Sequence, residues 1–513
     1  MALSELVKRE HIGPIVSVAA AAAVAAYATF RRRSDSPYKK IPVAEGGWPY
    51  FGHLLSLGPM PTRLMAKWHE ELGPIIQVNM GVLPYVMISD AEIAHEIFVT
   101  KGSVTSSRTF HTFTTNYYSL KGRGIVFASS DTNWKRTRTA ALSILAPKRV
   151  GEFDDLIQNE ADVLLESLMK ATEREGGINP VKSLQAFSLN VILTTTLAKR
   201  VTSVDDPLFK EIIHVVDEGM KRAAVDNDIS TFLPLLSFMN LFSNKIKNME
   251  DFIKNKRDPT FKRLIAEALQ GEQDCFVKSF YDSQYALTED DILVTINDLL
   301  SAGSDTVSVT LSWAFLILSQ HPEVQKKIRD EVDAFIKEHH RFPNFTERDA
   351  FPYLLSVQKE CFRYRPISLF GIPHLTTEDV ECRGYLIPKN TAITVNFNAV
   401  HLDAKRFPNP TEFIPERYID NTQTMMAAAN GKIEKRDHFN FGWGRRLCPG
   451  IHLAETELFY TWTRIFAKCV IEPELDNNGN PIHVSLDDAT DAGLVILPTP
   501  YKVRFTPRTD ALL

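Results

Sequence analysis

The sequence predicts a mainly α fold with small β-sheets, preceded by one N-terminal transmembrane helix. Helical patterns cover most of the 513 residues, whereas short strand-like runs occur only early and late in the chain. With 44% hydrophobic and 10% aromatic residues, the chain can bury one large core, and no Gly/Ser-rich linker or internal repeat divides it. A net charge of -5 argues against nucleic acid as a partner.

The first predicted element is a membrane anchor at residues 1–33. Ile12–Phe30 is a run of 19 residues without a charge, just long enough to span a bilayer. Arg31–Arg33 follow this run and outweigh Lys8 and Arg9 before it, so the positive-inside rule places the C-terminal part in the cytoplasm. A cleaved signal peptide and a mitochondrial presequence remain as alternatives. Five scattered cysteines, with no C-x-x-C pair, agree with a reducing compartment.

A proline-containing hinge is predicted at residues 34–61, ahead of one folded domain at 62–513. The hinge carries prolines along its length, from Pro37 through Pro42 and Pro49 to Pro61. Beyond it, Ile75–Met80 and Tyr85–Ile88 are typical of two short strands, because Gly81 and Pro84 separate two apolar runs. These strands predict a small sheet near the start of the domain.

Three further helices are predicted, and in two of them a pair of polar side chains lies on one helix face. Trp134 and Arg138 lie four residues apart, which suits either a shared ligand or a surface cation–π pair. Thr288–Gln320 begins with a capping-box pattern, and its 33 residues would span about 50 Å, enough to cross a whole domain. In a third helix, Glu360 and Arg363 have the i,i+3 spacing of an ion pair.

Cys448 is the most informative residue of the chain, because glycines, aromatic residues and arginines surround it. The pattern F-x-x-G-x-R-x-C-x-G is met at five positions and would arise by chance in roughly one chain of this length in ten thousand; the positions are Phe441, Gly444, Arg446, Cys448 and Gly450. The predicted helix after Gly450 would favour a thiolate at its N-terminus. A structural cysteine or a zinc ligand is the alternative, but no second cysteine lies nearby. The loop resembles the haem-binding loop of the cytochrome P450 family, and the resemblance extends from about residue 37 to residue 500.

The resemblance implies a cytochrome P450 fold with haem b, iron protoporphyrin IX, whose axial iron ligand is the Cys448 thiolate. Thiolate ligation favours O–O cleavage over oxygen storage. By the same resemblance, Arg446, Trp134, Arg138 and His374 contact the haem propionates.

Residues 302–306 match the family motif A-G-x-D/E-T. The resemblance implies that the small pair Ala302 and Gly303 opens a groove for oxygen, and that Asp305 and Thr306 are catalytic through proton delivery. A simple helix kink with a solvated Asp305 is the alternative.

Glu360, Arg363 and Arg417 are implied to form a buried ionic triad that supports the core beneath the haem loop. Two departures from the family stand out. Tyr418 replaces the more usual phenylalanine after Arg417, and the usual run of adjacent prolines in the hinge is missing.

The implied activity is that of a monooxygenase, inserting one oxygen atom from O2 into a lipophilic substrate such as a steroid, terpenoid, fatty acid or polyketide. No flavin or nicotinamide fingerprint occurs, so electrons are expected from NADPH through NADPH-cytochrome P450 reductase, with cytochrome b5 as a second candidate partner. Lys135, Arg136 and Arg445 are candidates for the docking face. The expected location is the endoplasmic reticulum membrane, with a single span and a cytoplasmic catalytic domain.

Two other functions stay open at this point. A haem-thiolate isomerase or dehydratase would act without O2, and a haem-containing lipid-binding protein would not turn over at all. The expected walls of the substrate pocket, all of which could instead be core packing, are Phe110, Phe113, Ala302, Ile367, Leu369, Phe370 and Leu494.

Overall fold

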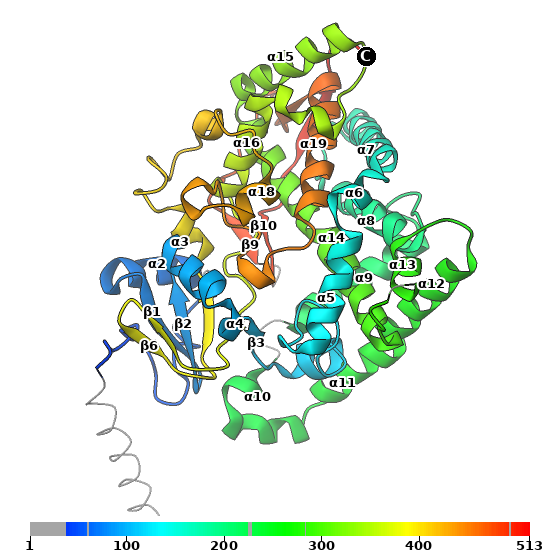
Figure 1. Ribbon diagram of the computed structural model, residues 1–513. Coiled ribbons are helices and arrows are strands. Elements are labelled where there is room, and N and C mark those ends of the chain that lie inside the picture. The colour runs from blue at the N-terminus through cyan, green and yellow to red at the C-terminus, as the bar shows by residue number, and fades with distance from the viewer. Residues whose placement is uncertain (1–36, 59–60, 224–227, 283, 492–493) are drawn as a thin grey trace, which may run out of the picture.

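The structure is a computed structural model that describes residues 37–58, 61–223, 228–282, 284–491 and 494–513. Figure 1 shows a small β-rich part, drawn in blue and yellow, beside a larger helical part. The predicted mainly α fold with small sheets is confirmed. The expected anchor at residues 1–33 lies outside the described residues, and among those described no helix is both long and apolar enough to cross a membrane.

The largest sheet has five strands in the order β1-β2-β7-β4-β3. Strands β1 (Ile75–Met80) and β2 (Leu83–Ile88) form the predicted antiparallel pair, and β2 pairs in parallel with β7 (Ala392–Val395). Strand β4 (His374–Leu375) lies between β7 and β3 (Ser107–Arg108), with Arg108 opposite His374. The sheet therefore joins segments that are nearly 300 residues apart in the chain.

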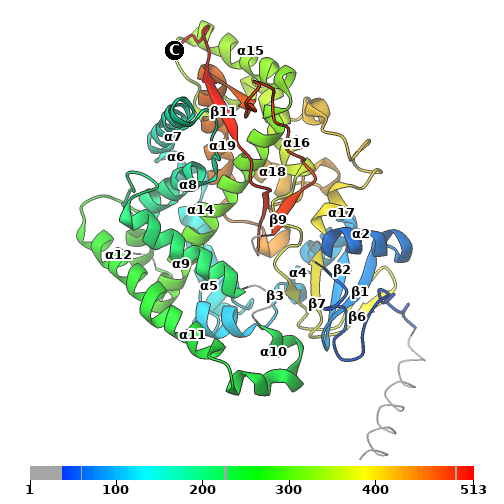
Figure 2. The same ribbon diagram turned by 180° about the vertical axis from the view of Figure 1, so that it is seen from behind.

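Three two-stranded sheets complete the β structure of the described residues. They pair β5 (Val380–Cys382) with β6 (Tyr385–Ile387), β8 (Cys469–Pro473) with β11 (Val503–Pro507), and β9 (Ala489–Asp491) with β10 (Ile496–Pro498). Figure 2, the view from behind, shows β11 running past α19 beside α7, which it contacts.

Helices make up the rest of the fold. The α-helices are α2 (Pro61–Leu72), α3 (Ala91–His95), α4 (Gly102–Thr105), α5 (Thr132–Ile144), α6 (Pro147–Gly151), α7 (Asp154–Glu175), α8 (Val181–Leu197), α9 (Pro207–Ala223), α10 (Ile229–Phe232), α11 (Lys245–Phe252), α12 (Asp258–Gln270), α13 (Phe276–Tyr281), α14 (Glu289–Ser319), α15 (Pro322–His339), α16 (Pro352–Tyr364), α17 (Phe397–His401), α18 (Met425–Asn430) and α19 (Ile451–Lys468). Short π- and 3-10 segments connect them: η1 (Glu96–Thr100), η2 (Thr112–Tyr118), η4 (Pro234–Leu241), η5 (Ile253–Arg257), η6 (Phe345–Ala350), η7 (Pro415–Tyr418), η8 (Ile433–Lys435) and η9 (Gly444–Arg446).

Helix α14 is the centre of the helical part. The Thr288 hydroxyl and the Asp291 carboxylate form the predicted capping box at its start, and the helix ends before Gln320. Its residues are buried on nearly every side, as expected for a helix in the middle of a large core. Apart from Glu289 and Asp290 in its first turn, the exceptions lie in the middle of the helix, at Ala302, Gly303, Asp305 and Thr306.

The loop that carries Cys448 lies where two hydrophobic cores meet. Trp443 belongs to the core beneath the sheet, where it stacks on Phe397 and Phe439 with ring centroids 5.7 and 5.2 Å apart. Leu447 belongs to the larger helical core, and Cys448 packs against it. The fold therefore holds this loop from both sides.

Candidate active site

Cys448 follows η9 and precedes α19 by two residues. Its backbone N–H donates to the Phe441 carbonyl at 2.9 Å, which closes the loop. Burial raises the pKa of the thiol, while the Gly450 backbone N–H and the positive charge of Arg138 oppose that rise. Cys275, Cys361, Cys382 and Cys469 are buried, whereas Cys448 remains partly exposed.

Gly444 shapes this loop. Its φ is +56°, and a Cβ there would lie 2.2 Å from the Phe98 carbonyl oxygen, a clash with backbone that cannot move aside. Only glycine therefore allows η1 and η9 to approach this closely.

Three arginines gather beside the loop without an acidic partner. Arg446 donates to the carbonyls of Ser106 at 2.9 Å and Ile125 at 3.0 Å, and Arg138 donates to the Leu447 carbonyl. Arg108 donates to the Ile372 carbonyl at 2.7 Å. Within the described ranges, none of the three guanidinium groups forms an ion pair with a carboxylate.

The electrostatics of this arginine cluster show that its positive charge is poorly compensated. Burial and, after it, repulsion from Arg108 and Arg138 together lower the pKa of Arg446 to about 7, and the charge of Asp131 opposes this only in part. Burial likewise lowers the pKa of Arg108 to about 9. Buried charges in proteins are normally paired, so this cluster is built for an anion.

Trp134 and His374 lie at the same cluster, but their polar atoms already have partners. The Trp134 indole N–H donates to the Ile125 carbonyl at 3.1 Å, and the Arg446 guanidinium lies 3.9 Å from the indole ring centroid. The sequence predicts a propionate contact for this indole; the structure places the ring beneath Arg446, and the propionate contact stays a prediction. His374 Nδ1 lies 2.8 Å from the Thr105 carbonyl, and burial and Arg108 lower its pKa well below the usual value, so the ring is neutral.

A buried carboxylate of α14 fixes the backbone that serves the arginines. Asp298 Oδ2 accepts from the backbone N–H groups of Ile125 at 2.7 Å and Val126 at 3.1 Å. The carbonyls of the same two residues face the other way, toward Arg446 and Arg108. Burial raises the pKa of Asp298 to about 6, against the effect of these hydrogen bonds.

The middle of α14 has one open face. Ala302 is exposed although the helix around it is buried, and Thr306, one turn later, is partly exposed. Gly303 faces α8 and not the open face, because a Cβ on it would lie 2.9 Å from Cβ and Cγ1 of Ile192 on α8. The sequence predicts that both small residues open one groove; in the structure Ala302 borders the open face, whereas Gly303 allows α8 to pack closely.

Asp305 and Thr306 take different directions. The Thr306 hydroxyl donates to the Ala302 carbonyl at 2.8 Å, on the open face. Asp305 accepts at 3.1 Å from the Gln185 side chain of α8, whose own oxygen accepts from Lys182 at 2.9 Å. Burial raises the pKa of Asp305 to about 6, so this carboxyl changes protonation near neutral pH.

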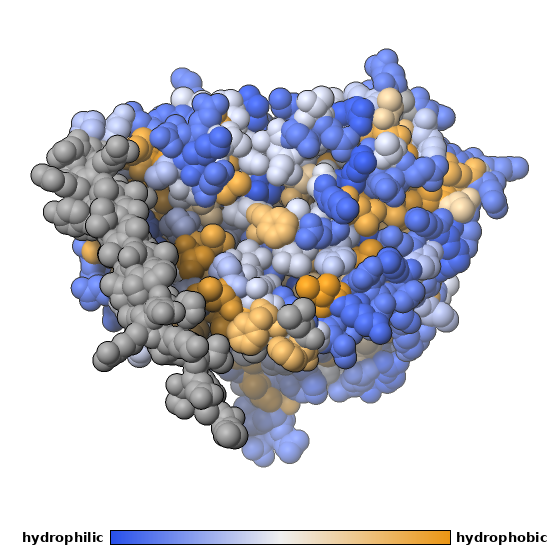
Figure 3. Space-filling view, turned by 90° about the horizontal axis from the view of Figure 1, so that it is seen from below, coloured by the Kyte–Doolittle hydropathy of each residue, from blue (hydrophilic) through white to orange (hydrophobic). Residues whose placement is uncertain are grey.

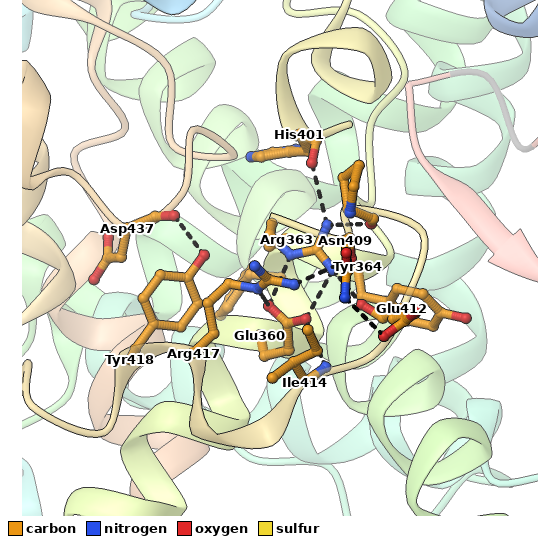
Figure 4. Close-up of polar contacts among 12 residues, drawn as sticks. Glu360, Arg363, Tyr364, His401, Asn409, Glu412, Ile414, Arg417, Tyr418 and Asp437 are labelled. Carbon is orange, nitrogen blue, oxygen red and sulfur yellow. Dashed lines mark hydrogen bonds and ion pairs between the residues drawn. The ribbon is translucent and has the colours of Figure 1, made fainter. Parts of the chain in front are cut away.

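Glu360, Arg363 and Arg417 meet in a buried ion-pair cluster (Figure 4). Arg363 holds both carboxylate oxygens of Glu360 at 2.7 Å, and Arg417 adds a third contact at 3.1 Å. Arg363 also donates to the carbonyls of His401 and Pro410. The cluster therefore ties α16 to the segment that leads into the Cys448 loop.

The hydroxyl group of Tyr418 accounts for the replacement of the family's usual phenylalanine at this position. Its hydroxyl donates to the Asp437 carbonyl at 2.8 Å, just ahead of the Cys448 loop (Figure 4). A phenylalanine could not make this bond. Asn440, in the same segment, donates to the Phe362 carbonyl of α16 at 2.8 Å.

The expected pocket walls are only partly brought together. Ile496 N donates to the Ile367 carbonyl at 2.8 Å, which sets residues 367–370 beside the segment that holds Leu494. Leu369 and Phe370 are half-buried. Phe113 is 1% exposed and packs against Tyr118 and Phe252, so the structure places it in the core rather than on a wall.

Phe110 instead lines a separate cavity of about 470 Å³ between the sheet and α10. The other side chains around it are mainly apolar or hydroxylated and carry no charge; they include Tyr85, Thr112, Ser230, Thr231 and Leu375.

Sequence reasoning missed Arg108, Asp298 and Gln185. Arg108 lies in a two-residue strand, which is too short to show an alternating polar and apolar pattern in the sequence. It comes to lie opposite His374 only because β3 pairs with β4 in the sheet. Asp298 carried a usable signal, because a carboxylate among apolar residues of a core helix requires a partner.

The residues present fit a haem-thiolate group. One buried guanidinium group, Arg446, and two half-buried ones, Arg108 and Arg138, form no ion pair with a described carboxylate, and they fit the two propionates. The Cys448 thiol is partly exposed, and a backbone N–H and Arg138 favour its thiolate form, which fits an axial iron ligand.

Comparisons with known proteins show the family of this chain. The sequence pattern of the family described as Cytochrome P450 matches residues 42–505. The chain is 30% identical to Cytochrome P450 2C21 of Canis lupus familiaris over 91% of the chain and 95% of the relative, and 28% identical to Phenylacetate 2-hydroxylase of Emericella nidulans over 97% and 96%. A zebra fish cytochrome P450, solved with Abiraterone, superposes with a TM-score of 0.71 at 25% identity, covering 87% of this chain and 100% of that one. The chain belongs to the cytochrome P450 family and is a monooxygenase of that family.

Proposed function

We propose that this enzyme inserts one oxygen atom from O2 into a lipophilic substrate of the steroid, terpenoid, fatty acid or polyketide kind, with electrons from NADPH. The observation that supports it most strongly is the combination of a partly exposed Cys448 thiol, an arginine cluster without a described counter-anion, and an open face on α14.

Cys448 would ligate the haem iron, and Arg108, Arg138 and Arg446 would hold the propionates, with neutral His374 beside them. When bound, haem b with a thiolate ligand supplies the redox chemistry that activates O2. The protein binds and orients it by fixed charges and by the loop that Gly444 shapes.

Asp305 and Thr306 divide the handling of protons. The Thr306 hydroxyl lies on the open face and can orient a water there. Asp305 reaches toward Lys182 at the surface through Gln185, so it can take up protons on the side away from the open face. This pair serves no purpose in an isomerase or dehydratase that works without O2.

Membrane association is the other part of the proposal. Apolar side chains gather in the middle of the face seen in Figure 3. In the apolar segment at 231–242, Leu235, Phe238 and Phe242 are 75%, 54% and 86% exposed. Surfaces of this kind bind membranes or other proteins. Together with the anchor expected at residues 1–33, they favour the endoplasmic reticulum membrane, with the catalytic domain in the cytoplasm.

The electron donor would be NADPH-cytochrome P450 reductase, with cytochrome b5 as a second donor. Lys135 and Arg445 are exposed on the side of the Cys448 loop and α5, where they can meet an acidic partner. The Arg136 guanidinium already lies 3.9 Å from the Asp291 carboxylate, so part of its charge is compensated within the chain.

The test is the absorption spectrum of the reduced protein with carbon monoxide. We expect the red-shifted band of thiolate-ligated haem, and its loss in Cys448→Ala. Cys361→Ala, which removes a buried cysteine of α16, is the matched control and should keep the band. Retention of the band by Cys448→Ala would refute the ligand assignment. Product formation by the wild type without O2 and reductase would refute the monooxygenase activity.

A further inference from the structure

The segment between α17 and Cys448 carries little regular structure. Residues 402–447, all of them within the described part of the chain, contain only the short helices α18, η7, η8 and η9 and no strand. A backbone outside helices and strands needs other contacts to fix it, because its buried N–H and C=O groups still require partners. The contacts made by this segment therefore set the path by which the chain reaches the cysteine.

Four buried charged side chains form one cluster beside this segment. They come from η6, α16, α19 and the segment itself, and each is at most 5% exposed: Arg348, Lys359, Glu455 and Asp437. Arg348 pairs with Glu455 at 2.8 Å, and Lys359 pairs with Asp437 at 3.0 Å. Two positive and two negative charges balance one another, as buried charges in a protein must.

The Lys359 ammonium holds two parts of the segment at once. It donates to the carbonyls of Asn421 at 2.7 Å and Gln423 at 2.8 Å, and its charge meets the Asp437 carboxylate. An ammonium group has three N–H donors, so two serve the carbonyls and one remains for the carboxylate. Burial lowers the pKa of Lys359, and the charge of Asp437 opposes this shift. The lysine thus brings residues 421–423 and residue 437 together.

The second ion pair of the cluster fixes the turn before α18. Arg348 donates to the Thr422 carbonyl, and Glu455 accepts from the backbone N–H of Met425 at 3.0 Å. Met425 is the first residue of α18. Both ion pairs therefore act on the segment through its backbone, from helices that lie on either side of it in the sequence.

The residues that follow the paired carboxylate are anchored one by one. The His438 ring stacks on Phe362 of α16 with ring centroids 4.7 Å apart, and the Asn440 side chain donates to the Phe362 carbonyl at 2.8 Å. That carbonyl lies in the last turn of α16, where helix carbonyls lack a partner within the helix. Between these two contacts, the Phe439 N–H donates to His401 Nε2 at 2.9 Å.

This run of contacts ends at the cysteine. The carbonyl of the next residue, Phe441, accepts from the Cys448 backbone N–H at 2.9 Å. On α16, Lys359 and Phe362 are three residues apart, which places them on one face of the helix. That face therefore fixes residues 437–440, and these residues lead directly to the carbonyl that holds the cysteine.

We infer that Lys359 and Asp437 are positioning residues: their ion pair fixes the start of residues 437–441 and, through the Phe441 carbonyl, the position of the Cys448 sulfur. The inference rests on the proposed role of Cys448 as iron ligand for its consequence. The placement of the loop can be measured without that role.

Three full-length variants and a control test the ion pair. Lys359→Met removes the charge at nearly the same side-chain length and leaves the Asp437 carboxylate buried and unpaired. Asp437→Asn is the milder change, because its amide oxygen can still accept from the His438 N–H, and it keeps the test valid if Lys359→Met does not fold. The double variant combines both changes. Lys327→Met is the matched control, since its ion pair with Glu416 lies on the same segment but is 55% and 46% exposed.

Hydrogen–deuterium exchange of the peptide spanning residues 436–447 measures the placement of the loop in the holoenzyme and needs no substrate. We expect exchange to become roughly five- to thirtyfold faster in each single variant and to stay unchanged in Lys327→Met. Because the two groups contact each other, the double variant should exchange no faster than the faster single variant. Unchanged exchange in both single variants, or effects that multiply in the double variant, would overturn the inference.

The consequence for the cysteine is measured on the reduced carbon monoxide complex in dilute urea that leaves the helix content unchanged. The red-shifted thiolate band should be lost at least about five times faster in the single variants than in the wild type. A lower melting temperature with a thiolate band as durable as that of the wild type would limit the pair to stabilising the fold and overturn its positioning role. A wild type without the thiolate band would refute the proposed iron ligand, and the exchange rates alone would then decide whether the pair places the loop.

Discussion

Arg446 forms no ion pair with a described carboxylate, although it is 8% exposed and donates three hydrogen bonds to backbone carbonyls. Carbonyl dipoles stabilise a guanidinium less than a carboxylate does. Burial therefore lowers the pKa of Arg446, repulsion from Arg108 and Arg138 adds to this effect, and the charge of Asp131 opposes it only in part. The same residue shows what sequence can and cannot reveal. Its place in the Cys448 motif marks it as functional, but its two companions come from other elements.

Thr306 is the residue at which oxygen activation is most directly tested. Thr306→Ala should leave folding and substrate affinity nearly unchanged, because the hydroxyl lies on the open face. Product per NADPH should fall roughly three- to tenfold, with the missing oxygen appearing as hydrogen peroxide, because proton delivery is mistimed. Both products are quantified in one reaction.

Thr310→Ala is its control, one turn later on α14. That hydroxyl donates to the Thr306 carbonyl and is 7% exposed, away from the open face. The oxygen-activation role of Thr306 would be wrong if the two variants behaved alike.

Asp298 predicts a pH dependence of stability. Its pKa is about 6 in the folded protein and 3.8 as the ordinary value, so between those pH values the native state binds the extra proton. Stability should therefore rise as pH falls from about 6 to about 4, and the ionised group costs up to roughly 3 kcal/mol above pH 6.

Asp298→Asn should remove this dependence while its amide oxygen still accepts from Ile125. The melting temperature of the variant should exceed that of the wild type at pH 7.5, and the difference should shrink by pH 5. A difference in melting temperature between variant and wild type that stayed constant from pH 7.5 to pH 5 would contradict the raised pKa of Asp298.

At the scale of elements, helix ends were predictable because their causes are local. Thr288 and Asp291 cap α14, and Pro322 stands at the start of the next helix. The partner of β2 was not predictable, because β7 pairs with it in parallel across about 300 residues and no local pattern encodes that register. For the same reason, the meeting of Arg108 with His374 needed the structure.

The packing of α14 on α8 depends on Gly303. Gly303→Ala would place a Cβ 2.9 Å from Ile192, so the helices must separate, at a cost of about 1–3 kcal/mol for overpacking. We expect a lower melting temperature, partly restored by Ile192→Ala, which removes the opposing methyl groups.

Gly151→Ala provides the matched comparison, since a Cβ at that helix position meets no atom within 4 Å. It should be neutral or slightly stabilising. If Gly303→Ala were equally well tolerated, the close contact between α8 and α14 would be ruled out.

On the scale of the whole molecule, the exposed apolar segment at 231–242 sits beside the N-terminal part of the fold. Val82 N donates to the Phe232 carbonyl at 3.0 Å, and Leu235 N donates to the Tyr50 hydroxyl at 2.7 Å. Trp48 and Leu55, from the same N-terminal part, are 59% and 63% exposed. One face thus combines apolar side chains from two distant parts of the chain.

Removing residues 1–33 should leave the carbon monoxide band intact, but the truncated protein should still bind phospholipid vesicles. Changing Phe238 and Phe242 to serine in that truncated protein should abolish most of this binding, since both rings are exposed. Co-sedimentation with vesicles measures it.

Leu475→Ser, at an exposed position after β8, controls for a general loss of surface hydrophobicity. Complete solubility of the truncated protein before any further change would exclude this segment as a membrane contact.

The arginine cluster has a consequence for how the protein is made in the cell. A newly synthesised chain must gather three like charges where two of its hydrophobic cores meet, and no ion pair with a described carboxylate neutralises them, so a bound anion stabilises this arrangement. Anything that binds the native state alone raises its population by mass action. The cellular abundance of this enzyme should therefore follow haem supply, with chains made in haem-starved cells passing to the proteases that clear unfolded protein.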